Sequence, residues 1–261
     1  DAARMFWLYD ELTGDASALE EMGAEFAFET ARFYASRARP AEAGGRYDLP
    51  DVGCPDQYHT FADNNFFINL MARWNLQWAA ELAADARCAA ARRKVGLADE
   101  EVARWQDVAQ GLHVAAPNAE GIIEEFDGFF GLSGDLDGIC ETYCRHSQAV
   151  KQPDVLAAFW PFEDLYDEPT RRANWRFYAA RTLHGSSLSL PGMAHAAARC
   201  GLSDEALDYL QRSVRMDLDD VNLDSERGVH VSGGALEWYT AVFGFGGLTP
   251  RREGLHFRPR L

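Results

Sequence analysis

Apolar residues recur three and four positions apart along most of this 261-residue chain, and this periodicity constrains its fold more than any other feature. Such spacing places the apolar side chains on one face of a helix. It predicts helices at 5–12, 19–38, 65–91, 99–110 and 153–162, and Ser203 has the residues of a further helix start after it. Only two short strands are expected, at 229–231 and 255–257. The sequence therefore predicts an all-α fold.

The composition indicates a folded protein, and its charge indicates which kinds of partner it can bind. Hydrophobic residues make up 47% of the chain and charged residues 25%, which excludes a disordered or coiled-coil protein. The formal net charge of -16 argues against binding to nucleic acid or to an anionic membrane surface. No apolar run approaches the roughly 18 residues of a membrane span. We expect small or neutral partners, no nucleic acid and no membrane.

The five cysteines, an odd number, favour a reducing compartment over a disulfide framework, and we therefore expect a cytoplasmic protein. Cys140 and Cys144 stand one helical turn apart, but only His146 lies near them, so they are interpreted as small core residues. A zinc site would need a second ligand pair at a matching spacing. Neither a metal nor a cofactor is predicted. The chain begins at Asp1 inside an expected helix, so a fragment or processed piece is expected, and a lost targeting signal stays open.

Four long segments between the expected helices combine aromatic residues with His, Asp, Asn, Ser and Gly: 47–65, 120–132, 179–189 and 219–237. Loops of this length and composition are usually functional. In the first of them, His59 and Asn64 are suited to hydrogen-bonding sugar hydroxyls, with aromatic faces beside them. The alternative is a capped turn in which Asp63 or Asn64 satisfies the first N–H groups of the following helix.

Six sequence blocks in order resemble glycoside hydrolase family 65, which contains the maltose, trehalose and kojibiose phosphorylases. They lie at 53–65, 69–76, 124–130, 150–155, 181–189 and 241–247. The resemblance implies an α/α barrel of six helical hairpins, with the active site among the loops at one end. It implies that residues 1–261 form the later hairpins only, as a partial catalytic domain without the family's N-terminal β-sandwich and C-terminal β domain. We expect exposed apolar edges, covered by the missing part of the barrel on another chain or by a homodimer.

The family's chemistry is implied in the same way. Its phosphorylases cleave an α-linked glucoside with inversion, using inorganic phosphate as nucleophile, and release β-glucose 1-phosphate. One carboxylic acid is then enough, because phosphate replaces the activated water of an inverting hydrolase. At the position of that acid this chain has Gln57, and an amide cannot supply the proton. The neighbouring Asp56 is weighed as a substitute, and Ala179 replaces a second carboxylate that binds the glucosyl unit.

The remaining site residues come partly from side-chain chemistry and partly from the resemblance. Asp56, His59 and Asn64 are expected to bind substrate because short polar side chains hydrogen-bond sugar hydroxyls. The resemblance implies that Lys151 and Gln152 lie near the bound sugar. It also implies that phosphate is bound by His184, Ser186 and Ser187 and by the glycine pair Gly233 and Gly234, which is displaced by two positions from the family pattern. The second phosphate loop is altered, with Glu237 where the family has Thr. Glu237 is either the base of an inverting hydrolase or a solvated or capping helix residue. Three interpretations follow: an α-glucoside phosphorylase, a hydrolase that uses Glu237, and an inactive sugar-binding relative.

Overall fold

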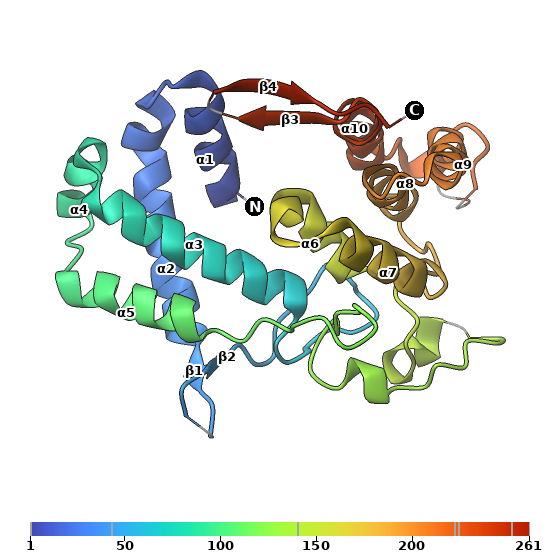
Figure 1. Ribbon diagram of the computed structural model, residues 1–261, viewed down its shortest axis with the longest axis horizontal. Coiled ribbons are helices and arrows are strands. Elements are labelled where there is room, and N and C mark those ends of the chain that lie inside the picture. The colour runs from blue at the N-terminus through green and yellow to red at the C-terminus, as the bar shows by residue number, and fades with distance from the viewer. Residues whose placement is uncertain are drawn as a thin grey trace. The chain divides into compact units, whose positions relative to one another are not determined.

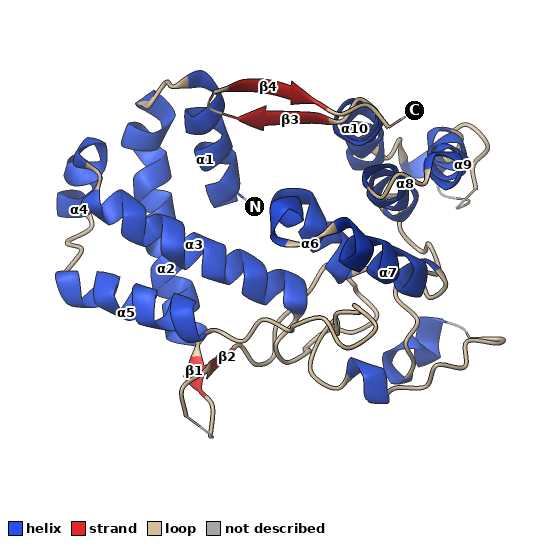
Figure 2. Cartoon of the chain, in the orientation of Figure 1, coloured by secondary structure: helices blue, strands red, loops and turns tan. Residues whose placement is uncertain are grey.

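The computed structural model describes residues 2–42, 44–139, 141–221, 223, 225–251 and 253–260. Helices dominate it, and the strands of the described residues form two two-stranded sheets (Figures 1 and 2), which confirms the all-α prediction. The chain divides into two compact units. The first unit comprises residues 1–52, 61–114 and 251–254, and the second unit comprises 53–60, 115–250 and 255–261. Among the described helices, none has both the length and the apolar character needed to cross a membrane.

The first unit is built from five α-helices and one short sheet. Its elements are α1 (Ala2–Thr13), a π-helical turn (Leu19–Gly23), α2 (Ala24–Arg37), β1 (Arg39–Pro40), β2 (Tyr47–Asp48), α3 (Phe66–Ala84), a 3-10 turn (Ala86–Cys88), α4 (Ala89–Lys94) and α5 (Asp99–Gly111). β1 and β2 pair antiparallel. The expected helix over 19–38 is thus present, with its first turn in the wider π form.

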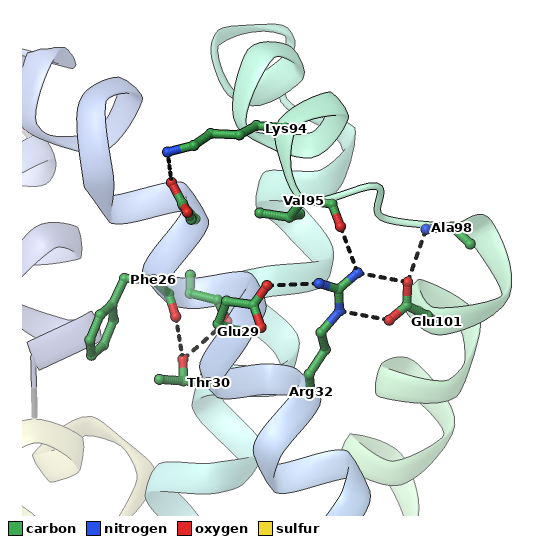
Figure 3. Close-up of polar contacts among 10 residues, drawn as sticks. Phe26, Glu29, Thr30, Arg32, Lys94, Val95, Ala98 and Glu101 are labelled. Carbon is green, nitrogen blue, oxygen red and sulfur yellow. Dashed lines mark hydrogen bonds and ion pairs between the residues drawn. The ribbon is translucent and has the colours of Figure 1, made fainter.

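Helices α2, α3 and α5 surround the core of the first unit. Phe28 of α2 and Trp105 of α5 stack there with ring centroids 6.1 Å apart, and both are buried. At the edge of this core, Arg32 of α2 donates from Nε to Glu101 Oε1 at 2.7 Å (Figure 3). Glu101 Oε2 also accepts the Ala98 N–H at 3.1 Å, which satisfies an N–H group that precedes α5. One carboxylate therefore caps α5 and binds it to α2.

The helix expected over 65–91 ends early, at Ala84. Asp85 has extended backbone angles (φ -80°, ψ 124°), and its Oδ1 accepts the Arg87 N–H at 2.9 Å, so the chain turns and restarts as α4. Aspartate competes in this way with helical hydrogen bonding. The beginning of α3 agrees with a capped turn, but the cap is Asn65, whose Oδ1 accepts the Ile68 N–H at 3.1 Å.

The second unit contains the other helices. Its elements are two 3-10 turns (Phe129–Gly131, Glu141–His146), α6 (Asp154–Phe162), a 3-10 turn (Glu163–Leu165), α7 (Glu168–Ala179), α8 (Ser189–Arg199), α9 (Ser203–Val214), a 3-10 turn (Ser225–Arg227), α10 (Val231–Tyr239) and a π-helical turn (Thr240–Phe245). The hairpin of β3 (Leu248–Arg251) and β4 (Gly254–Phe257) contributes residues to both units.

The strand expected at 229–231 was wrong, whereas the strand at 255–257 is confirmed as part of β4. Val231 is the first residue of α10, so Gly233 and Gly234 belong to a helix and not to a loop. Two consecutive glycines usually mark a turn, which is why the sequence favoured a longer loop. Here Gly233 is buried, and a Cβ at this position would lie 3.4 Å from the Ser187 carbonyl oxygen. The missing side chain allows α10 to pack against residues 186–187.

Candidate active site

The loop 54–60 of the second unit is fixed by a buried carboxylate at its centre. Asp56 is fully buried, and its Oδ1 accepts two backbone N–H groups, from Lys151 at 2.8 Å and from Tyr58 at 3.2 Å. The Asp56 N–H donates in turn to Asp154 Oδ1 at 2.8 Å. The backbone on both sides of Gln57 is therefore held by hydrogen bonds to buried carboxylates.

His59 and Cys54 complete the packing of this loop. His59 is buried, with Nδ1 2.6 Å from Asp56 Oδ2 and Nε2 2.9 Å from the Ser147 carbonyl oxygen. The Cys54 thiol donates to the Asp56 and His59 carbonyl oxygens, each at 3.2 Å. Burial, with Asp154 next in weight, raises the pKa of the Cys54 thiol far above its ordinary value. The thiol is therefore neutral and serves as a hydrogen-bond donor.

Gln57 is exposed on this loop, as is Thr60 at its end. Lys151 Nζ donates to Gln57 Oε1 at 2.9 Å, so an ammonium group lies against the amide that replaces the family's acid. Gln152 Nε2 donates to the Pro55 carbonyl oxygen at 2.7 Å, while its Oε1 is buried without a hydrogen-bond partner among the described residues. The structure thus brings Gln57, Lys151 and Gln152 together.

A third carboxyl group lies beneath the loop. Glu125 is fully buried, and neither of its oxygens makes a hydrogen bond of normal geometry within the described part of the chain. Burial raises the pKa of Glu125 well above its ordinary value, and the Asp154 and Asp56 carboxyl groups raise it further. The Asp154 backbone N–H has the opposite effect on this pKa but is too weak to reverse it.

A backbone bridge joins the Lys151 segment to the predicted phosphate residues. Val150 pairs in parallel with Thr182: the Val150 N–H donates to Arg181 O and the Leu183 N–H to Val150 O, both at 2.9 Å. His184 follows at once with a left-handed φ of 55°. Lys151 and His184 are therefore held in neighbouring segments.

The His184 side chain is fixed in a turn over residues 184–189. Its Nδ1 lies 2.8 Å from Ser189 Oγ, and burial lowers its pKa to about 4, so the ring is neutral at physiological pH. Ser186 O accepts the Ser189 N–H at 3.0 Å, and Ser186 Oγ accepts the Leu188 N–H at 3.2 Å. Ser187 is half-buried at the middle of this turn.

Gly233 brings this turn to the beginning of α10. A Cβ at Gly233 would meet Ser187 O at 3.4 Å and His230 Cβ at 3.7 Å. The first N–H groups of a helix have no partner within the helix, and those of Ser232 and Gly233 in α10 belong to this set. His230, just before the helix, is held by Asp217, whose Oδ2 accepts the His230 N–H at 2.8 Å and whose Oδ1 lies 2.6 Å from Nδ1.

Two predicted site residues have their polar groups occupied by the protein itself. Glu237 lies in α10, half-buried, and its Oε1 accepts a hydrogen bond from Ser213 Oγ at 2.7 Å. Asn64 belongs to the first unit, where its Oδ1 accepts the Leu49 N–H at 3.0 Å and its Nδ2 donates to Asp48 Oδ1 at 2.9 Å. Their roles as base and as sugar ligand stay predictions.

Comparison with known proteins identifies the family. The model of the glycosyl hydrolase family 65 central catalytic domain matches residues 1–239. The chain belongs to glycoside hydrolase family 65. It is 35% identical to a 1,2-alpha-glucosylglycerol phosphorylase of Bacillus selenitireducens, over 97% of this chain and 36% of that protein. It is 31% identical to a kojibiose phosphorylase of Caldanaerobacter subterraneus subsp. tengcongensis, over 98% of this chain and 36% of that protein.

A solved structure agrees with this assignment. The chain superposes on a candidate kojibiose phosphorylase from the human microbiome with a TM-score of 0.89 and 25% identity, over 97% of this chain and 36% of that one. The fold is therefore that of a portion of the family 65 α/α barrel. The chain spans about a third of the length of the relatives that it matches.

In this family 65 chain, sequence reasoning missed the polar residues that support the site. Asp154 and Glu125 lie within the sequence blocks that resemble the family, but the sequence assigned no role to either of them. Asn174 of α7, whose Oδ1 accepts the Ile123 N–H at 2.9 Å, was not singled out at all. One signal was present: Asp154 follows Pro153 at the start of an apolar helix, where a carboxylate is favoured. Nothing in the sequence marked its contact with Asp56, 98 positions earlier.

Proposed function

We propose that this protein is a glycoside phosphorylase that takes an α-linked glucoside and inorganic phosphate as substrates. The observation that carries the proposal is the contact between Lys151 Nζ and Gln57 Oε1 on a loop anchored by buried Asp56. It sets a cation and a polar side chain at the position where the family's acid stands. The relatives, which are named as phosphorylases of glucosylglycerol and kojibiose, support the same reaction class.

Phosphate would bind between the turn at 186–187 and the beginning of α10. The Ser187 hydroxyl and the first N–H groups of α10 are suited to an oxyanion, since they supply donors without adding net charge. The approach of Gly233 to Ser187 supports this placement. The glucosyl unit would lie by Lys151 and Gln152, and the buried Gln152 Oε1 without a partner would accept a hydrogen bond from a sugar hydroxyl.

A second candidate function follows from Gln57. An amide does not protonate the leaving oxygen, and loss of a general acid typically lowers a rate by about 10²–10⁴-fold. A protein that binds an α-glucoside without turning it over would retain the same Lys151 and Gln152 contacts. The hydrolase that uses Glu237 is less favoured, because Glu237 Oε1 is bonded to Ser213.

One experiment separates these functions: incubation of the protein with α-linked disaccharides and glucosylglycerol, with and without phosphate. Sugar phosphate formed only with phosphate supports the phosphorylase, and free glucose without phosphate indicates the hydrolase. Saturable sugar binding with no product indicates the binding protein. Pairing with another copy or chain and cytoplasmic localisation remain predictions from the sequence.

Calorimetric titration with phosphate tests the anion site. Ser187→Ala is expected to weaken phosphate binding by about 1 kcal/mol, the net value of one hydrogen bond, which is roughly fivefold in Kd. Ser36→Ala is the control, because the Ser36 hydroxyl donates to Phe33 O on an exposed face of the first unit. Equal affinities of wild type and Ser187→Ala, or no binding by the wild type at millimolar phosphate, would reject this anion site.

A further inference from the structure

Three buried carboxyl groups, one of them on the loop that carries Gln57, come from three separate segments and interact with one another. Asp56, Glu125 and Asp154 each have 0% of their surface exposed. Carboxylates that share a buried site cannot all be ionised at ordinary cost, so at least one of them takes a proton. The hydrogen bonds determine which one it is.

Asp56 and Asp154 both accept hydrogen bonds from backbone N–H groups. Asp56 accepts N–H groups from Lys151 and Tyr58, with His59 Nδ1 beside its second oxygen. Asp154 accepts the Asp56 N–H. Such donors stabilise the ionised form of a carboxyl group. Neither oxygen of Glu125 makes a hydrogen bond of normal geometry within the described part of the chain, and the Asp154 backbone N–H stabilises its ionised form only weakly. Of the three carboxyl groups, Glu125 is therefore the one that is most easily neutral.

The cationic groups nearby are engaged elsewhere. Lys151 Nζ donates to Gln57, and Arg181 donates from Nε to Gln148 Oε1 and lies over the Phe177 ring. Among the described residues, the Cys54 thiol and the Tyr178 hydroxyl also interact with Glu125. The first donates to backbone carbonyl oxygens of its own loop, and the second donates to Ile123 O at 2.6 Å.

We propose that Glu125 is protonated in the folded protein and acts as a positioning residue: its neutral carboxyl group lets Asp56 and Asp154 stand together as carboxylates, and these two fix the backbone on both sides of Gln57. The role of Gln57 in binding or catalysis rests on the proposed function. The protonation of Glu125 and the anchoring of the loop are independent of that function, and both can be measured without any sugar or phosphate.

The proton has a thermodynamic consequence with a definite sign. Because the pKa of Glu125 is raised in the folded state, folding takes up a proton at any pH between the ordinary glutamate value of about 4.3 and the raised value. The contribution of this group is fully present below pH 4.3 and is lost as the pH rises through the folded pKa. Within that window the folding equilibrium constant falls tenfold per pH unit on account of Glu125, equivalent to 1.36 kcal/mol.

The test compares the wild type with Glu125→Gln, which keeps the shape of the neutral acid and has no proton to lose. Glu124→Gln is the matched control: it is the adjacent residue, its Oε1 accepts the Phe130 N–H at 3.0 Å, and its side chain is half-buried. Because the two units need not unfold together, the readout is hydrogen exchange of slowly exchanging amides in α6 to α8, from pH 5.5 to 8.

Hydrogen exchange gives the free energy of the opening that exposes these amides. As the pH rises, this free energy should fall more steeply in the wild type and in Glu124→Gln than in Glu125→Gln, and the difference in slope should correspond to one proton. As the pH rises, the Asp56, Tyr58 and Lys151 amides should lose protection more steeply in the wild type than in Glu125→Gln. Parallel pH profiles for all three proteins would overturn the proposal, as would equal loss of protection at these amides. Neither readout depends on turnover, so a protein without phosphorylase activity would still give a clear answer.

If Glu125→Gln does not fold, carboxyl carbon NMR of the glutamate-labelled wild type decides the question. One glutamate that stays protonated far above the ordinary range supports the proposal when side-chain to backbone correlations assign its resonance to Glu125. Titration of every glutamate in the ordinary range would overturn it.

Discussion

Replacing Asn174 by alanine should release the segment that leads to Glu125. Asn174 is fully buried in α7 and makes three hydrogen bonds: its Oδ1 accepts the Ile123 N–H at 2.9 Å, and its Nδ2 donates to the Gly121 and Thr170 carbonyl oxygens, both at 2.8 Å. One amide thus holds residues 121–123 against the helix, immediately before Glu125.

The expected cost follows from the burial of each partner. Ile123 is fully buried, so its N–H would be left without a partner at about 1–3 kcal/mol. Gly121 and Thr170 are only half-buried, so their carbonyl oxygens find water, and these two bonds together add about 1 kcal/mol. We therefore expect Asn174→Ala to destabilise the second unit by about 2–4 kcal/mol.

Asn118→Ala is the matched control for this change. Its Oδ1 also accepts two N–H groups near the same segment, those of Glu120 and Ile122 at 2.9 Å, but it is exposed, so water replaces the lost bonds. Its cost should stay below about 1 kcal/mol. The assay is denaturant unfolding together with exchange of the Ile123 amide. Equal losses for the two variants, or an Ile123 amide that exchanges as slowly as in the wild type, would refute the reasoning.

Two further predictions concern single side chains. Gln57→Glu restores a carboxylic acid at the family's position and should raise the phosphorolysis rate by about 10²–10⁴-fold; a change below about threefold in an assay of phosphate consumption or sugar phosphate formation would mean that residue 57 does not protonate the leaving group. Burial, with Arg199 next in weight, lowers the pKa of His195 to about 3. The unfolded chain binds a proton on this group from about pH 6.5 downward, so its contribution is present above pH 6.5 and is lost on acidification by about 1.4 kcal/mol per pH unit. His195→Phe should therefore show a shallower loss of stability between pH 6 and 4 in denaturant titrations, and an unchanged slope would contradict a buried neutral His195.

The helices were predictable because their apolar faces recur along the sequence itself. The periodicity identified α1 to α3 and α5 to α6, and Ser203 marked the start of α9. The periodicity gave the wrong boundary or element where a side-chain hydrogen bond or a packing contact determined the backbone conformation. Asp85 ends the apolar helix because its side chain accepts a hydrogen bond from the nearby Arg87 N–H. The two glycines of α10 are typical of a turn in the sequence, but in the structure Gly233 is helical and lies close to Ser187. Boundaries and breaks depend on such contacts, which the pattern alone does not contain.

In the candidate site, too, some residues could be predicted from the sequence and others could not. Gln57, Lys151, Gln152 and the serines of 186–187 were identified from motifs, and the structure gathers them in one unit. The residues beneath them could not be found in this way, because Glu125 differs from an ordinary solvated glutamate only through its burial. Its neighbours there are Asp154 of α6 and Asp56 of the loop 54–60, which lie far apart from each other in the sequence.

The Cys54 thiol has a consequence for chemical handling of this protein. Alkylating reagents, peroxide and disulfides react with the thiolate of a cysteine, and a thiol whose pKa lies far above neutrality supplies almost none. Although Cys54 is only half-buried and adjoins the candidate site, it should therefore resist iodoacetamide and mild oxidants. A fluorescent or spin label attached through an introduced surface cysteine would leave this loop untouched.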